Sequence, residues 1–132
     1  MESKVINDKI KLTRRDDQIY IYKAINNCSV DLETVKEMTK VGDSWNGTEL
    51  CANLIDIRDV FFIDSKARSY GAEQYRSYVA GQAILIESKI SSYFANLFLK
   101  FSNPKVPTKL FTKEDEAMEW LNLQMKKYKN PN

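Results

Sequence analysis

The chain has 132 residues, of which 43% are hydrophobic and 29% are charged, as in one ordinary globular domain. Its formal net charge of +2, with no cluster of Lys and Arg among stacking aromatic residues, argues against nucleic acid as a partner. The sequence contains no histidine, which excludes Ser–His and Cys–His nucleophile pairs and every metal site that needs an imidazole ligand.

The remaining composition favours a single cytoplasmic domain, residues 1–132, with no transmembrane segment. The first residues contain no apolar run typical of a signal peptide. Cys28 and Cys51 lack metal-ligand spacing, and we expect both to be reduced thiols. The four glycines form neither a phosphate-binding loop nor a dinucleotide fingerprint, so no cofactor is expected. Residues 1–8 and 129–132 are expected to be frayed.

Two strands are predicted at residues 9–15 and 18–25, where apolar and polar residues alternate. Asp16 and Asp17 between them suit a tight turn. A helix over residues 32–46 follows, with Asp31 as its N-cap and Gly47 as its end.

The segment 50–78 is the central unit of the chain. Residues 50–57 are nearly all apolar, which is typical of a central parallel strand covered on both faces. A short turn leads to an amphipathic helix over residues 65–78, capped by Asp64 or Ser65.

The strand–helix unit then repeats twice. Strands are predicted at residues 80–86 and 106–111, and helices at residues 90–101 and 113–129, the last one capped by Thr112. The order β-β-α-β-α-β-α-β-α predicts an α/β fold with a five-stranded, mixed but mostly parallel sheet and about four helices. The first strand is expected to pair antiparallel.

Asp56, Asp59 and Asp64 cluster near the carboxyl end of the central strand, where open α/β sheets place their ligands. They could hold Mg²⁺ or act as acid and base in an enzyme. Alternatively they are a strand-terminal, a turn and a capping aspartate, each with local hydrogen bonds. The second interpretation is favoured, so no catalytic and no metal-binding residue is predicted.

Two further surfaces are candidates for partners. Helical spacing would put Arg68 and Tyr75 on one side of the helix that begins near Ser65, and Tyr and Arg are common anchors of protein interfaces. The aromatic-rich helix 90–101 has a broad apolar arc with Phe98 at its rim and Leu99 outside it. These two residues could form a homodimer contact or a lipid-facing edge.

The run NLIDIRDVFFIDSKA resembles the signature of the STAS domain, the sulphate transporter and anti-sigma factor antagonist family with the SpoIIAA-like fold. The order of elements is similar too, and so is the C-terminal stretch NPKVPTKLFTKEDEAMEWL, which resembles bacterial STAS/Sec14-like proteins. The resemblance implies a phosphorylation switch at Ser65, next to Asp64. The chain departs from the family pattern at Lys66, Ala67 and Arg68.

The resemblance implies a non-catalytic regulatory module that binds a protein through residues 59–68, with Asp59, Arg68 and Tyr75 on the partner surface. A second hypothesis is a Sec14-like carrier of a lipid or another apolar ligand, which would need an apolar cavity. A metal-assisted enzyme that uses the three aspartates is the third.

Overall fold

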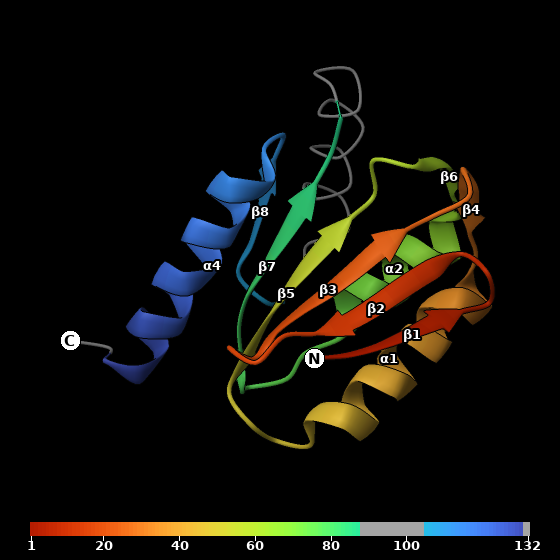
Figure 1. The fold of residues 1–132 in the computed structure, drawn as a ribbon. Coiled ribbons are helices and arrows are strands. Elements are labelled where there is room, and N and C mark those ends of the chain that lie inside the picture. Colours follow the sequence, from red (N-terminus) through yellow and green to blue (C-terminus); the bar gives the residue numbers. More distant parts are fainter. Residues whose placement is uncertain (88–104, 131–132) are drawn as a thin grey trace.

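A computed structural model describes residues 1–87 and 105–130 and shows a mixed sheet with helices on both faces (Figure 1). The strands of this sheet pair in the order β1-β2-β3-β5-β7-β8. They are β1 (Glu2–Ile6), β2 (Ile10–Arg14), β3 (Ile19–Ala24), β5 (Cys51–Asp56), β7 (Val79–Leu85) and β8 (Thr108–Phe111). β1, β2 and β3 are antiparallel, and the pairs from β3 to β8 are parallel, so the predicted α/β class with a mostly parallel sheet is confirmed.

The sheet has one strand more than the sequence predicted, because residues expected to be frayed form β1. Asn7 and Asp8 join β1 to β2 with φ angles of 52° and 56°, and the Lys9 amide donates to the Ile6 carbonyl at 3.0 Å. Asn and Asp tolerate this left-handed backbone, which closes the tight turn over residues 7–9 between the paired Ile6 and Ile10. β1 therefore forms because Asn7 and Asp8 allow a tight turn to β2, a signal that the search for alternating apolar and polar residues did not include.

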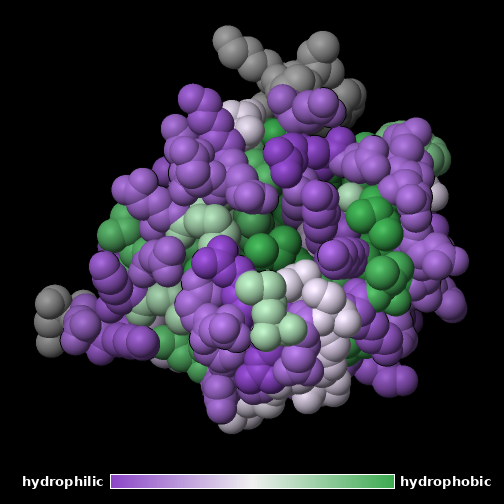
Figure 2. Space-filling model, viewed as in Figure 1, coloured by the Kyte–Doolittle hydropathy of each residue, from purple (hydrophilic) through white to green (hydrophobic). Residues whose placement is uncertain are grey.

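Two helices lie on one face of the sheet and one on the other (Figure 1). α1 (Leu32–Asn46) and α2 (Ser65–Glu73) share the first face, and α4 (Glu114–Lys129) covers the second. These are three helices in the described ranges, against the four expected, and the predicted helix 90–101 falls outside those ranges. Polar residues cover most of the face seen in Figure 2, with hydrophobic residues gathered at its centre beside α4.

The helix ends agree only in part with the predicted caps. Asp31 accepts a hydrogen bond from the Thr34 amide at 2.9 Å, and Gly47 ends α1 with φ at 61°, both as predicted. Asp64 stands at the N-cap of α2 but its side chain makes no capping hydrogen bond. The N-cap position of α4 is Lys113, so the predicted cap at Thr112 was wrong.

A second, two-stranded sheet was missed altogether. β4 (Cys28–Val30) pairs in parallel with β6 (Val60–Ile63), in the segment predicted to be a turn. Asp59 anchors the pair, since its side chain accepts from the Asn27 amide at 2.9 Å and its carbonyl from the Cys28 amide at 3.1 Å. Such short strands depend on a partner that is distant in sequence, and local pattern alone does not identify them.

Candidate functional site

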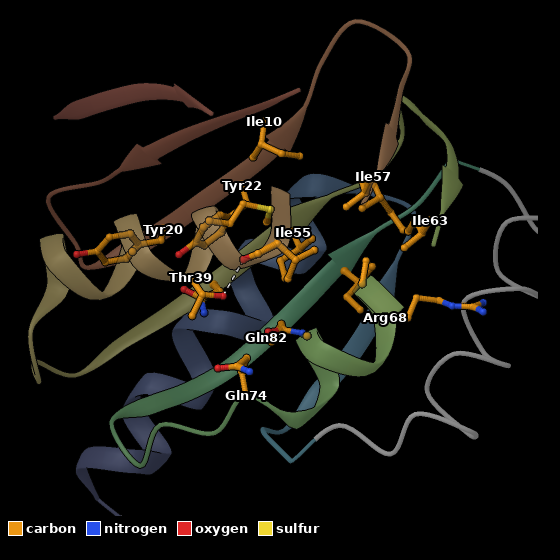
Figure 3. Close-up of a pocket in the computed structure, with 18 of the residues that line it drawn as sticks. Ile10, Tyr20, Tyr22, Thr39, Ile55, Ile57, Ile63, Arg68, Gln74 and Gln82 are labelled. Carbon is orange, nitrogen blue, oxygen red and sulfur yellow. Dashed lines mark hydrogen bonds between the residues drawn. The ribbon is translucent and has the colours of Figure 1, made fainter. Parts of the chain in front are cut away.

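A cavity of about 740 Å³ lies between the sheet and the two helices α1 and α2 (Figure 3). Because side chains alternate between the faces of a strand, every second residue of three neighbouring strands lines it. These residues are Tyr20 and Tyr22 of β3, Cys51, Asn53 and Ile55 of β5, and Gln82 and Ile84 of β7. The intervening residues pack under α4.

The helices contribute apolar and small side chains to the other side of the cavity. Val35 and Met38 come from α1, and Ala67 and Gly71 from α2. A Cβ atom added to Gly71 would meet no described atom closer than the Val35 Cγ1 at 4.0 Å, so there is room beside this glycine. Small residues on a short helix therefore leave the space between α2 and the sheet unfilled.

The polarity of the cavity differs between its two ends. Figure 3 shows Thr39, Gln74 and Gln82 toward one end, and Ile57 and Ile63 toward the other. Asn53 and Gln82 are register partners on adjacent strands, which places their side-chain amides next to each other on the cavity face. A long apolar wall with a few grouped polar residues is the usual composition of a small-molecule site.

Ion pairs neutralise charges on the lining. Asp56 is only 3% exposed, and both its carboxylate oxygens accept from the Arg58 guanidinium, at 3.0 and 2.8 Å. This hydrogen bonding raises the pKa of Arg58 above its ordinary value. Likewise the two oxygens of Asp43 accept from Arg76 at 3.2 and 2.9 Å, which raises the pKa of Arg76.

Burial keeps the other titratable groups of the cavity face neutral. It raises the pKa of the Cys51 thiol to about 11, and it raises the pKa of Tyr22 well above its ordinary range. The pKa of Tyr20 is raised for the same reason, and its hydroxyl has no hydrogen-bond partner among the described residues. The two cysteines, Cys28 and Cys51, are buried and free.

The structure gives the three predicted aspartates separate environments. Asp56 is held by Arg58, Asp59 anchors β4, and Asp64 precedes α2, where its amide donates to the Val30 carbonyl at 3.0 Å. Among residues 1–87 and 105–130, no group of three acidic or cysteine side chains is arranged to hold a metal ion. Asp56 and Asp59 thus make the local contacts that the structural interpretation expects.

The predicted partner surface is only partly assembled. Ser65 is the first residue of α2 and is exposed, and Asp64, Ser65 and Arg68 all border the cavity. Tyr75 is 57% exposed but lies beyond the end of α2 at Glu73, so the expectation that it shares a helix side with Arg68 was wrong. Phe98 and Leu99 lie outside the described residues.

Two features of the site were not predicted from the sequence. The first is the exposed pair Phe61 and Phe62 on β6, with 67% and 57% of their surfaces exposed. The second is the pair Asn53 and Gln82, whose signal was present as one polar residue inside each of two otherwise apolar strands. A polar residue on the same face of neighbouring buried strands indicates a polar contact or a site in the sheet interior.

The comparisons with solved structures identify the fold. A protein of the DUF3478 family from Shewanella loihica PV-4, described as having a SpoIIAA-like fold, matches with a TM-score of 0.62 and 21% identity. The match covers 92% of this chain and 98% of that one. The chain therefore has a STAS/SpoIIAA-like fold, as its sequence predicted.

The family is given by a sequence profile. The profile of a domain of unknown function, DUF7793, matches residues 12–125, and the chain belongs to this family. A protein of unknown function from Arthrobacter sp. FB24 also matches, with 22% identity, a TM-score of 0.32, and coverage of 85% of this chain and 98% of that one. No curated protein matches. Within the described ranges, no helix is both long and apolar enough to cross a bilayer.

Proposed function

We propose that the protein binds a small, largely apolar molecule in the cavity between the sheet and the helices α1 and α2. The observation that carries the proposal is the cavity itself, about 740 Å³ in volume and lined mainly by aliphatic and aromatic side chains. This volume falls within the range of about 300 to 1,000 Å³ that is typical of small-molecule sites. The volume favours the second of the hypotheses drawn from the sequence, a carrier of a lipid or another apolar ligand.

Binding without catalysis is the chemistry that these residues favour. The buried carboxylate Asp56 is engaged on both oxygens by Arg58, so it is poorly placed to exchange a proton. The Cys51 thiol, with its pKa raised to about 11, remains protonated at neutral pH and is a weak nucleophile. We therefore propose a ligand-binding protein that is not an enzyme.

Native mass spectrometry of the purified protein tests the proposal, since a retained ligand appears as a discrete added mass. Gly71→Leu should abolish that mass, because its side chain would enter the free space beside Val35. Ser69→Leu places the same side chain on the exposed side of α2 and is the control. A wild-type protein that retains no ligand and binds no apolar fluorescent probe would refute the proposal.

A second candidate function is the regulatory protein contact inferred from the STAS resemblance. The exposed rings of Phe61 and Phe62 favour it, because they stand on β6 directly before Asp64 and Ser65. Exposed aromatic residues are frequent anchors of protein interfaces. The partner surface proposed here consists of Asp59, Phe61, Phe62, Ser65 and Arg68.

Affinity capture with three variants tests this contact. Phe62→Ser should lose a partner, and Ser65→Asp should alter its affinity by adding charge at the contact. Leu123→Ser is the control, since Leu123 is similarly exposed on α4. If both variants retain every wild-type partner, the contact lies elsewhere.

The predicted homodimer through Phe98 and Leu99 stays a prediction, and sedimentation of Leu99→Glu against wild type tests it.

A further inference from the structure

Two side-chain amides on the cavity face have hydrogen-bonding capacity that the described chain does not use. Asn53 of β5 and Gln82 of β7 are register partners, and both line the cavity. In the ranges 1–87 and 105–130, neither side chain has a hydrogen-bond partner. Nearby Gln74 differs, because its amide donates to the Tyr70 carbonyl at 3.0 Å and accepts from Arg76 at 3.1 Å.

An amide offers both a donor and an acceptor, and leaving either one desolvated and unpaired is costly. Asn53 and Gln82 are each partly buried in the middle of a sheet whose other face is closed. A bound apolar molecule would displace water from them and must therefore replace those hydrogen bonds. Together the two amides can donate to an acceptor and accept from a donor on the same ligand group.

The ionised side chains on the sheet and at the polar end are already paired. Asp56 is paired with Arg58 at 2.8 Å, and Asp43 is paired with Arg76 at 2.9 Å. Arg68, which also borders the cavity, lies with Ile57 and Ile63 toward the opposite end from Gln82 (Figure 3). A charged ligand group beside the amides would thus be desolvated without a counterion, which is strongly unfavourable.

We propose that the ligand has an apolar body and one uncharged polar group, such as a hydroxyl, carbonyl or carboxamide, held by Asn53 and Gln82. The apolar body then extends along Ile55 toward Ile57 and Ile63. This inference rests on the proposed function and specifies the ligand class: neutral amphipathic molecules, and not carboxylates, ammonium ions or phosphates.

Competition binding against a fluorescent apolar probe tests the inference with molecules of one chain length. The competitors are 1-decanol, decanoate and decylammonium at pH 7.5, and undecane is the apolar reference with the same heavy-atom number as 1-decanol. Wild type should bind 1-decanol at least about tenfold more tightly than either ion, because an ionised group beside the two amides would be desolvated without a counterion.

Two nearly isosteric variants separate hydrogen bonding from general apolar affinity. Asn53→Leu and Gln82→Met should each lower the affinity for 1-decanol by about tenfold. The affinity for undecane should stay the same or increase. Gln124→Met is the matched control, because Gln124 lies on α4 against Gly81, on the opposite face of the sheet. It should change neither affinity.

The outcomes distinguish the two proposals. If neither the fluorescent probe nor any of the four competitors binds, the proposed function fails, and this inference fails with it. If the competitors bind and decanoate or decylammonium has the highest affinity, the cavity is a site for ions and the inference is overturned. If 1-decanol is preferred but keeps its affinity in both folded variants, Asn53 and Gln82 do not hold the polar group. Should a variant not fold, the order of the wild-type affinities for the four competitors still decides whether the ligand is charged.

Discussion

The two faces of the sheet differ in how completely the helices fill them. Under α4 the packing is closed, and Ala52, Leu54, Ala83, Leu85 and Leu121 are all 0% exposed. A Cβ atom on Gly81 would lie 3.1 Å from Gln124 and 3.3 Å from Trp120, so α4 approaches the strand as closely as a glycine permits. On the other face, α1 and α2 leave a cavity of about 740 Å³.

This difference separates stability from binding within the same strands. Leu54 and Ile55 are neighbours on β5, yet one is completely buried beneath α4 and the other borders the cavity. A well-packed face can stabilise a sheet whose opposite face keeps free volume and polar groups for a ligand. The following predictions test whether the two faces divide these roles.

The largest contrast is expected between Leu54→Ala and Ile55→Ala. Leu54→Ala should lower the free energy of unfolding by about 2 to 5 kcal/mol, because the closed face cannot collapse around the new void. Ile55→Ala should cost roughly half as much, because its side chain already borders free volume. Urea unfolding of both variants measures the difference. Equal costs would show that the cavity is filled in solution.

Enlarging an alanine should likewise cost more stability on the face under α4 than on the cavity face. Ala83→Leu forces extra methyl groups against α4 and should cost about 1 to 3 kcal/mol. Ala67→Leu, at the buried face of α2, can extend into the cavity and should cost less than about 1 kcal/mol. Thermal unfolding tests the pair, and a larger loss for Ala67→Leu would contradict the division of roles.

Alkaline pH should destabilise the cavity face through Cys51. Burial raises the pKa of this thiol to about 11, whereas the unfolded chain ionises near the ordinary value of 9.0. The folded state therefore keeps a proton that the unfolded state loses, so this contribution is fully present below pH 9 and is lost as the pH rises to about 11. The loss is on the order of 2 kcal/mol.

The comparison of wild type with Cys51→Ala isolates this contribution. The variant should lose less stability than wild type between pH 8.5 and about 11 when urea unfolding is measured at several pH values. Cys28→Ala removes the other buried thiol, whose pKa is also raised by burial, and measures how much of the alkaline loss belongs to that residue. Parallel pH profiles for wild type and Cys51→Ala would contradict the prediction.

The smallest effect distinguishes the two helices of the cavity face. Asp31→Ala removes the hydrogen bond to the Thr34 amide and should cost about 1 kcal/mol. Asp64→Ala should cost less than about 0.5 kcal/mol, because that side chain makes no capping hydrogen bond. Thermal unfolding compares the two variants, and an equal loss would mean that Asp64 caps α2 in solution.

Local patterns in the sequence were sufficient to predict most of the elements. Alternation identified β2 and β3, the apolar run identified β5, and the caps Asp31 and Gly47 fixed both ends of α1. Acidic residues in the first turn of α4 and lysines in its last turn are likewise a local signal. These predictions succeeded because strand and helix periodicity, caps and helix-dipole charges depend on residues within a few positions of one another.

Only the tertiary structure decided where the free space lies and which polar groups face it. Strand register brings Asn53 beside Gln82, and parallel pairing of β4 with β6 leaves Phe61 and Phe62 exposed. Alternation specifies two faces for each strand, but not which face a helix will fill. That choice depends on how closely each helix can approach the sheet, and here Gly81 lets α4 close one face while the short α2 leaves the other open.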